Sequence, residues 1–432
     1  MTANRPTPVD GGGGKADLSG SAPGPLRAAP GRTSRLCTLL AATAHAHPER
    51  VAFVDPPHKA LWSGRAAITW TYGAAAEIVA RLANGLRGWR LPPASRVGIA
   101  MAGSSESFLA YLAVEAAGHI PCLLPLSLDE DALVTAVQAA SIAAVLTQSR
   151  FGPLAPAERL CRVAVRYFGL RYLAAFGPDV PDGVINLDGM ALDQAGGPFA
   201  PGPGGLISFA AGDPAQPIHR SGDALLAAIA VHLVTARVVP GDRILSLLPA
   251  TDLRGLVTGL GSALVAGAAL ETLPVFESGS FAAALGRPVS TRLVAPAALE
   301  RNLATCRLPE TLVSIQLVHR APSALGAHRL APADPARSVI DVVAFDETAL
   351  LTGARMGSDV ALTLANPERG PLFSTLMALR RDPDGFLAFR GRACQAGPLQ
   401  RGSPEAEVTA EWLPSRFQAS TEAGRATAIL RR

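Results

Sequence analysis

The sequence predicts an α/β protein with two stacked αβα-type subdomains, largely parallel sheets and a small β-rich subdomain. Short apolar strands alternate with amphipathic helices, and this order joins parallel strands by helical crossovers. A Gly/Pro-rich stretch at residues 196–205 divides the alternating pattern into two units. The length of 432 residues also exceeds what one hydrophobic core usually organises, which favours more than one subdomain.

Residues 1–33 are predicted to form a disordered tail. They contain four consecutive glycines, several prolines and almost no large apolar side chain, so they bury too little surface to offset the entropy of ordering. The first α/β subdomain is predicted over residues 34–200. Its strands and helices are expected in alternation, with strands at 51–54, 68–72, 96–101, 120–124 and 143–147 and helices around 36–44, 78–89, 108–116 and 129–140.

The second α/β subdomain is predicted over residues 201–335, where the alternation repeats. Residues 336–392 are predicted to form a small β-rich subdomain, because short extended runs are separated by turns such as Asp384-Gly385, a dipeptide typical of hairpins. Residues 393–432 contain one alternating run and are predicted to be a short C-terminal tail.

The composition argues against several classes of function. The net charge is only +4, and no stripe of basic and aromatic residues is present, so a nucleic-acid partner is not expected. The five cysteines are far apart and never form C-x-x-C, which argues against a zinc site or disulfides and favours a reducing cytoplasm. The longest charge-free apolar run, residues 256–270, is shorter than the ~20 residues of a membrane span. We therefore expect a cytoplasmic protein without a membrane span.

Several sequence blocks follow one another at characteristic spacings, namely residues 72–76, 81–86, 96–100, 108–118, 240–249, 264–268, 382–387 and 391–392. Together they resemble the adenylate-forming superfamily of acyl-CoA synthetases, peptide-synthetase adenylation domains and luciferases, most clearly from Ile68 to Arg392. The resemblance implies the fold of the large N-terminal domain of these enzymes. It also implies a reaction in which a carboxylate attacks the α-phosphate of ATP, giving an acyl-adenylate and pyrophosphate.

The phosphate loop of that family is a Ser/Thr/Gly-rich turn that ends in Pro-Lys-Gly. In this sequence Gly212 and Pro217 keep the spacing of the loop and are the candidates for nucleotide binding there. The lysine position is Ile218, the hydroxyls of the loop are gone, and Asp213 places a negative charge where phosphates would lie. The nearby hydroxyl of Ser208 is interpreted as that of a strand residue.

The adenine-binding motif of the family matches residues 345–349. Phe345 is the candidate for stacking on a base, and Thr348 is the candidate for contact with a phosphate. The glutamate that holds magnesium in the family is replaced by Ala349. Glu347 is the remaining metal candidate, but a ligand displaced by two positions seldom keeps its geometry, so Glu347 is predicted to be solvated.

Other family positions are also changed. Met377 stands where an aspartate grips the ribose, and it cannot accept those hydrogen bonds, whereas Arg392 is kept near the ribose. The histidine of the acyl channel is replaced by Asp252, which would repel a carboxylate substrate unless Arg254 screens it. Asp252 and Arg254 are therefore the acyl-pocket candidates. The resemblance also implies a mobile C-terminal domain with a catalytic lysine, and residues 393–432 contain no lysine.

The leading hypothesis is a synthetase/ligase-like protein with degraded ATP-handling motifs, catalytically weak or inactive, that binds an acyl or aryl carboxylate or partners an active enzyme. The first alternative is a functional acyl-adenylate-forming ligase that uses ATP, Mg²⁺ and a separate C-terminal domain. The second is a scaffold or interaction protein, in which large side chains should fill the former acyl channel, whereas a ligand-binding role needs an open cavity. The sequence leans against an enzyme, and only the ligase alternative requires a cofactor.

Overall fold

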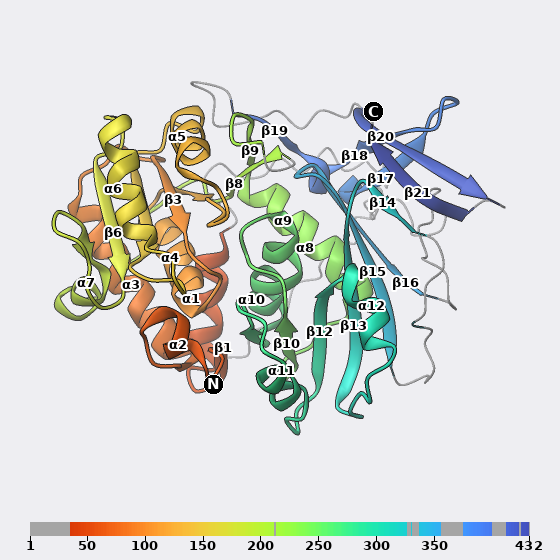
Figure 1. Ribbon diagram of the computed structural model, residues 1–432, viewed down its shortest axis with the longest axis horizontal. Helices are drawn as coiled ribbons and strands as arrows, with labels where there is room; N and C mark the ends of the chain where they lie inside the picture. The colour runs from red at the N-terminus through yellow and green to blue at the C-terminus, as the bar shows by residue number, and fades with distance from the viewer. Residues whose placement is uncertain are drawn as a thin grey trace, which may run out of the picture. The chain divides into compact units, whose positions relative to one another are not determined.

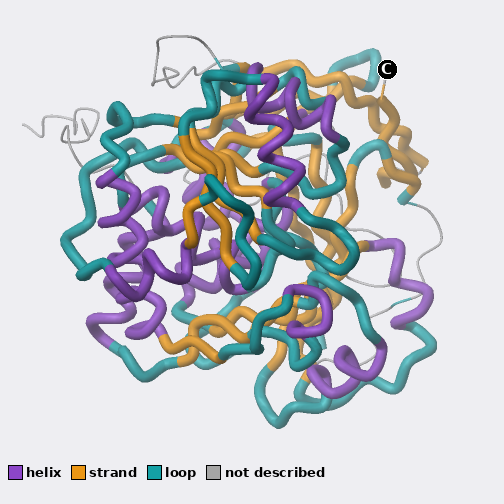
Figure 2. The backbone as a smooth tube through the Cα atoms, turned by 60° about the vertical axis from the view of Figure 1, so that its left-hand side comes forward, coloured by secondary structure: helices purple, strands orange, loops and turns teal. Residues whose placement is uncertain are grey.

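The computed structural model describes residues 35–210, 213–325, 330, 337–355, 375–399, 412–422 and 425–431. The predicted tail at residues 1–33 lies outside them. The described residues form two large, largely parallel sheets and a smaller antiparallel sheet, with helices packed against the strands (Figure 1; Figure 2). This arrangement confirms the predicted fold class.

The first large sheet has eight strands among the described residues, in the order β19-β9-β8-β4-β3-β5-β6-β7. It is parallel from β8 to β7, and β9 and β19 are added antiparallel at one edge. The strands are β3 (Arg96–Ala100), β4 (Ile120–Leu123), β5 (Ala144–Gln148), β6 (Tyr172–Phe176), β7 (Ile185–Asn186), β8 (Leu206–Phe209), β9 (Pro217–Arg220) and β19 (Ala396–Pro398).

The second large sheet also has eight described strands, in the order β16-β15-β13-β12-β10-β11-β1-β2. Only the outer pairs β1–β2 and β15–β16 are antiparallel. The strands are β1 (Val51–Val54), β2 (Thr69–Thr71), β10 (Arg243–Ser246), β11 (Ala269–Thr272), β12 (Thr291–Pro296), β13 (Leu312–Arg320), β15 (Ser338–Phe345) and β16 (Ala349–Ala354).

One apolar core is shared by the two large sheets. Helix α4 (Ser105–Ala116) is buried along its whole length, and its side chains belong to the same core cluster as strand residues of both sheets, such as Ile99 and Ile244. The outer faces carry separate clusters under different helices. The remaining helices are α1 (Leu36–Ala46), α2 (Lys59–Ser63), α3 (Tyr72–Gly88), α5 (Glu130–Ala139), α6 (Pro156–Arg166), α7 (Leu187–Asp193), α8 (Gly222–Ala236), α9 (Leu253–Gly255), α10 (Ser262–Ala266), α11 (Ser278–Leu285) and α12 (Glu300–Leu303), with shorter or wider turns at η2 (Leu256–Gly261), η3 (Ala297–Leu299) and η4 (Arg392–Cys394).

Each large sheet takes strands from both sides of the predicted subdomain boundary at residue 200. Strands β1 and β2 precede the boundary but pair in the second sheet, with β11 next to β1. Strands β8 and β9 follow the boundary but pair in the first sheet, with β8 next to β4. The division between the sheets is therefore not a single point in the sequence.

The small antiparallel sheet has the order β14-β21-β20-β18-β17, and all of these strands except the teal β14 are blue in Figure 1. The predicted Asp384-Gly385 turn joins its strands β17 (Ala378–Arg381) and β18 (Phe386–Arg390), and β14 is Ser323–Ala324. Within the range predicted as a short tail, β20 (Leu413–Glu422) and β21 (Arg425–Arg431) complete this sheet. Alternate residues Phe417 and Ala419 of β20 are buried, as expected for a strand with one face toward the core.

None of the helices in the described part of the chain is long and apolar enough to cross a membrane.

Candidate functional site

The turn between β8 and β9, which matches the phosphate loop, is closed by Asp213. Its carboxylate accepts the backbone N–H of Ala215 at 2.9 Å and Nε2 of Gln216 at 2.7 Å. Pro217 is buried as the first residue of β9, and Gly212 lies outside the described residues. Donors of the turn thus bind a carboxylate of the chain itself.

Glu347 lies in the turn between β15 and β16 and is only 4% exposed, so the prediction that it is solvated is wrong. The Ser208 hydroxyl donates a hydrogen bond of 2.7 Å to Glu347 Oε2, and the Leu253 N–H donates one of 3.0 Å to the same oxygen. These partners come from β8 and from the first residue of α9. Burial, and next the charge of Asp252, raise the pKa of Glu347 to about 7.

Arg220, at the end of β9, connects three of the matched motifs. Its guanidinium donates hydrogen bonds to the carbonyl oxygens of Ala393 at 2.5 Å, Glu347 at 3.0 Å and Thr348 at 2.8 Å. The side chain is fully buried, and burial lowers its pKa. The role of Arg220 was not predictable from the sequence, because its acceptors are backbone carbonyls more than a hundred residues away.

Phe345 is fully buried in the core under the small sheet. Its ring centroid lies 5.0 Å from that of Phe389 and 5.5 Å from that of Phe417. The ring therefore has no exposed face on which a base can stack. Met377 is also buried, and Arg392 is exposed at the start of η4.

Asp252 and Arg254 form an ion pair. The charge of Asp252, which would otherwise repel a carboxylate substrate, is therefore screened by Arg254. Arg254 Nε donates to Asp252 Oδ2 at 2.9 Å, and a second guanidinium nitrogen contacts the same oxygen. The other carboxylate oxygen of Asp252 accepts the Gly255 N–H at 3.1 Å and caps α9. Among the residues that the structure describes, no group of three or more His, Cys, Asp or Glu side chains is placed to hold a metal ion.

The described residues next to Asp252 enclose a small space. A cavity of about 10 Å³ lies there, lined among others by Met101, Phe108 and Tyr111 from one side and by Thr251 and Leu256 from the other. This is about the room that one water molecule needs. Phe108 and Tyr111 thus leave no room for an acyl chain in this cavity.

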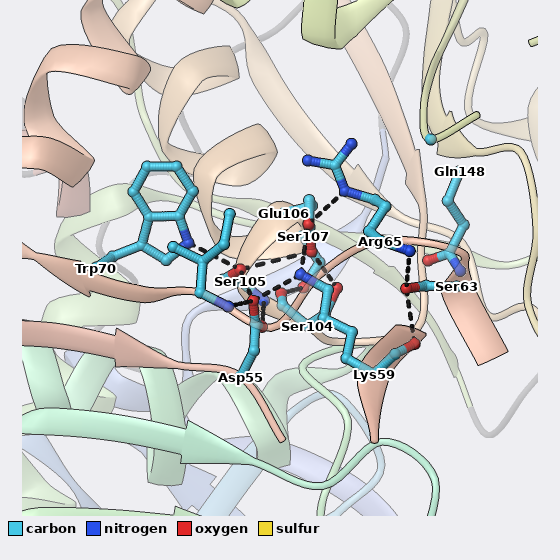
Figure 3. A network of polar contacts seen from close by, with 12 residues as sticks. Asp55, Lys59, Ser63, Arg65, Trp70, Ser104, Ser105, Glu106, Ser107 and Gln148 are labelled. Carbon is cyan, nitrogen blue, oxygen red and sulfur yellow. Dashed lines mark hydrogen bonds and ion pairs between the residues drawn. The ribbon is translucent and has the colours of Figure 1, made fainter. Parts of the chain in front are cut away.

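A second polar cluster, shown in Figure 3, was not anticipated from the sequence. Lys59 on α2 is fully buried between two carboxylates, with Nζ 2.6 Å from Asp55 Oδ2 and 2.5 Å from Glu106 Oε1. Arg65 Nε donates to Glu106 at 2.7 Å, and Ser105 donates to Asp55 from both its backbone N–H and its hydroxyl. The cluster joins the segment between β1 and β2 to the start of α4.

All four carboxylate oxygens in this cluster accept hydrogen bonds from the chain. Glu106 Oε2 accepts from the Ser104 hydroxyl at 2.7 Å, and the backbone N–H groups of Ser105 and Ile68 donate to Asp55. Burial, and next the charge of Glu106, raise the pKa of Asp55. Burial acts to raise the pKa of Glu106 as well, but Lys59 and Arg65 outweigh it and lower that pKa. We interpret the cluster as a structural connection between the two large sheets.

Known proteins share part of this sequence and the described fold. Residues 40–169 match the family model described as AMP-binding enzyme, which confirms the resemblance seen in the sequence. No curated protein sequence matches the chain.

The described fold is that of the large N-terminal domain of adenylate-forming ligases. MatB from Rhodopseudomonas palustris with bound ATP is 18% identical, with a TM-score of 0.69 over 92% of this chain and 78% of that protein. A putative long-chain-fatty-acid CoA ligase from the same organism is 17% identical, with a TM-score of 0.69 over 93% and 99%. O-succinylbenzoate coenzyme A synthetase (MenE) from Bacillus subtilis, in complex with ATP and magnesium, is 14% identical, with a TM-score of 0.67 over 91% and 98%.

Proposed function

We propose that this chain is a non-adenylating relative of the adenylate-forming ligases, which keeps their fold but acts by binding rather than by activating a carboxylate with ATP. In this proposal it serves in the cytoplasm as a ligand-binding protein or as the partner of an active enzyme. The relatives named above include proteins whose structures hold ATP. We distinguish this chain from them by the chemistry of its own side chains.

One observation carries the proposal: donors at the candidate nucleotide site are already occupied by carboxylates of the chain. The Ser208 hydroxyl and the Leu253 N–H donate to Glu347, and the Ala215 N–H donates to Asp213. The guanidinium of Arg220 is likewise held by backbone carbonyls. A triphosphate would have to displace these partners before it gained any hydrogen bond from the same groups.

Repulsion between negative charges also weakens the binding of a triphosphate at this site. Two like charges 4 Å apart repel by about 1 kcal/mol in bulk water and by about 4 kcal/mol near a protein surface. Because 1.4 kcal/mol corresponds to a factor of ten in affinity, a single added carboxylate at that distance weakens phosphate binding by roughly five- to a thousandfold. Asp213 supplies such a charge in the turn that matches the phosphate loop.

The narrow cavity beside Asp252 supports the same proposal. A bound carboxylic acid of useful size needs a pocket of roughly 300 Å³ or more. The cavity of about 10 Å³ does not accept one without movement of Phe108 or Tyr111. Among the described residues, this cavity therefore offers no room for an acyl or aryl ligand.

A second candidate function is an active ligase, and the proximity of Asp252 to Glu347 favours it. Asp252 directly precedes Leu253, whose N–H donates to Glu347 Oε2 at 3.0 Å, and the charge of Asp252 helps to raise the pKa of Glu347. Magnesium is often held by one or two carboxylates together with substrate phosphates. In this reading Glu347 and Asp252 would hold Mg²⁺, whose positive charge would offset the repulsion between these carboxylates and the phosphates of ATP.

Carboxylate-dependent exchange of labelled pyrophosphate into ATP distinguishes the two functions. The proposal predicts no exchange above that of a protein-free control with medium-chain fatty acids or with aryl carboxylates, at millimolar ATP and Mg²⁺. Exchange that appears with one of these acids and is lost in Glu347→Gln would instead establish the ligase. The exposed variant Glu158→Gln serves as the matched control, because it removes a carboxylate from α6 and not from the site.

A further inference from the structure

An apolar pocket lies on the outer face of the second large sheet, between α11 and α12. Its volume is about 660 Å³, within the range of roughly 300–1,000 Å³ typical of small-molecule sites. The lining is mainly aliphatic and aromatic, with Leu247, Phe276, Phe281, Leu285, Leu303 and Leu308 among its residues. Its lining residues do not overlap those of the cavity beside Asp252.

Small residues on α11 and just after it help to keep the pocket open. Ala282 and Gly286 line it. Ala282 has only a methyl group and Gly286 has no side chain, so neither fills the space toward α12. At the rim, Phe276 is 58% exposed and its ring packs only 5.6 Å from that of Phe281. Large apolar side chains left open to water in this way favour an apolar ligand, because a ligand that covers them removes that surface from water.

The polar side of the pocket carries a positive charge. Arg307 lines it and is exposed, and within the described residues its guanidinium has no hydrogen-bond or ion-pair partner. Asn302 and Ser278 are further polar lining residues. The described residues that line the pocket include no acidic one, and the nearby Glu277 uses its carboxylate to cap α11 through the N–H groups of Gly279 and Ser280. The charge of Arg307 is thus available to an anionic ligand.

We propose that this pocket binds a monocarboxylate with an apolar chain or ring, whose hydrocarbon part lies between α11 and α12 and whose carboxylate pairs with Arg307. The guanidinium fork matches the geometry of a carboxylate, and the apolar lining takes the rest of the ligand. The inference deepens the ligand-binding role of the proposed function, on which it rests, by naming a site and a class of ligand, and it does not depend on whether the chain handles ATP.

Decanoate and decanol are suitable probes, because they share a chain and differ in charge. We expect calorimetry to show saturable binding of decanoate to the full chain. Ala282→Trp, which places a large ring inside the pocket, should weaken binding of both probes at least tenfold. Ala283→Trp is the matched control, since Ala283 is the next residue of the same helix, is exposed and does not line the pocket. It should leave the affinity unchanged.

Arg307→Gln tests recognition of the carboxylate. An exposed charge pair contributes little, so the variant should weaken decanoate binding by about two- to fivefold and leave decanol binding unchanged. Absence of decanoate binding to the wild type, or equal binding by Ala282→Trp and Ala283→Trp, would overturn the pocket as the site. An equal loss of decanoate and decanol in Arg307→Gln would overturn the role of the arginine. Binding of ATP to the chain would contradict the proposed function, but it would not change the conclusion on decanoate binding in this pocket.

Discussion

Replacing Glu347 with glutamine tests whether this side chain is a buried acid, as the structure shows, or a solvated one. Glutamine keeps the shape of the carboxyl group, and its carbonyl oxygen accepts hydrogen bonds as Glu347 Oε2 does from Ser208 and Leu253. It stays neutral at every pH. The variant therefore resembles the protonated form of Glu347.

The magnitude follows from the raised pKa. The pKa of Glu347 lies at about 7, against 4.5 for an ordinary glutamate. Because one pKa unit corresponds to ~1.4 kcal/mol, ionising Glu347 inside the fold costs up to about 3 kcal/mol. The pKa is raised on folding, so the stability that the protonated group contributes is complete below pH 4.5 and is lost as the pH rises through about 7.

Thermal unfolding at pH 5 and at pH 8 provides the assay. At pH 5 the variant and the wild type should unfold at nearly the same temperature. At pH 8 the variant should be more stable by roughly 1–3 kcal/mol, which for a chain of this size is a rise of about 1–3 °C in the midpoint. Glu115, whose pKa is also raised to about 7 by burial, is present in both proteins and cancels in the comparison.

Two results would refute the reasoning. A variant that is less stable at pH 8 would show that the fold favours the ionised carboxylate of Glu347. A difference that is the same at pH 5 and pH 8 would show that Glu347 does not titrate between them. The control Glu158→Gln, on the exposed side of α6, should show no difference at either pH.

Two further predictions concern buried polar groups. Lys59→Met should destabilise the protein by about 3–5 kcal/mol, because Asp55 and Glu106 would lose the buried cation between them, and a loss below 1 kcal/mol in denaturant unfolding would contradict this account. Gln316→Met should be neutral or should stabilise the protein by about 1–2 kcal/mol, because both amide atoms of Gln316 are buried and, within the described residues, their contact with the His232 ring falls outside good hydrogen-bond geometry; a clear destabilisation in the same assay would show that this contact is a stabilising hydrogen bond.

The fold class followed from local pattern, whereas strand pairing across the chain did not. Alternating apolar runs identify strands such as β3 and β5, and the helices between them impose parallel pairing. The same pattern does not state which sheet a strand joins. Strands β1 and β2 therefore belong to the second sheet, although the sequence places them among elements of the first. Long-range pairing of this kind depends on tertiary packing.

The candidate site was predictable at the level of motifs but not of contacts. The sequence located the Asp252–Arg254 pair, because the two residues are neighbours on one turn. It did not reveal that Ser208 and Glu347, 139 residues apart, share a hydrogen bond. It also assigned base stacking to Phe345, since aromatic residues at that position resemble a motif, but Phe389 and Phe417 arrive from other strands and bury the ring.

Calorimetric titration of the purified full chain with millimolar ATP and Mg²⁺ shows whether the chain binds the nucleotide. The Bacillus subtilis O-succinylbenzoate coenzyme A synthetase, whose structure contains ATP and magnesium, serves as the positive control in the same buffer. The account predicts heat of binding for the control and none for this chain, because Glu347 and Asp213 already occupy donors at the site. Saturable, magnesium-dependent binding of ATP to this chain would contradict it.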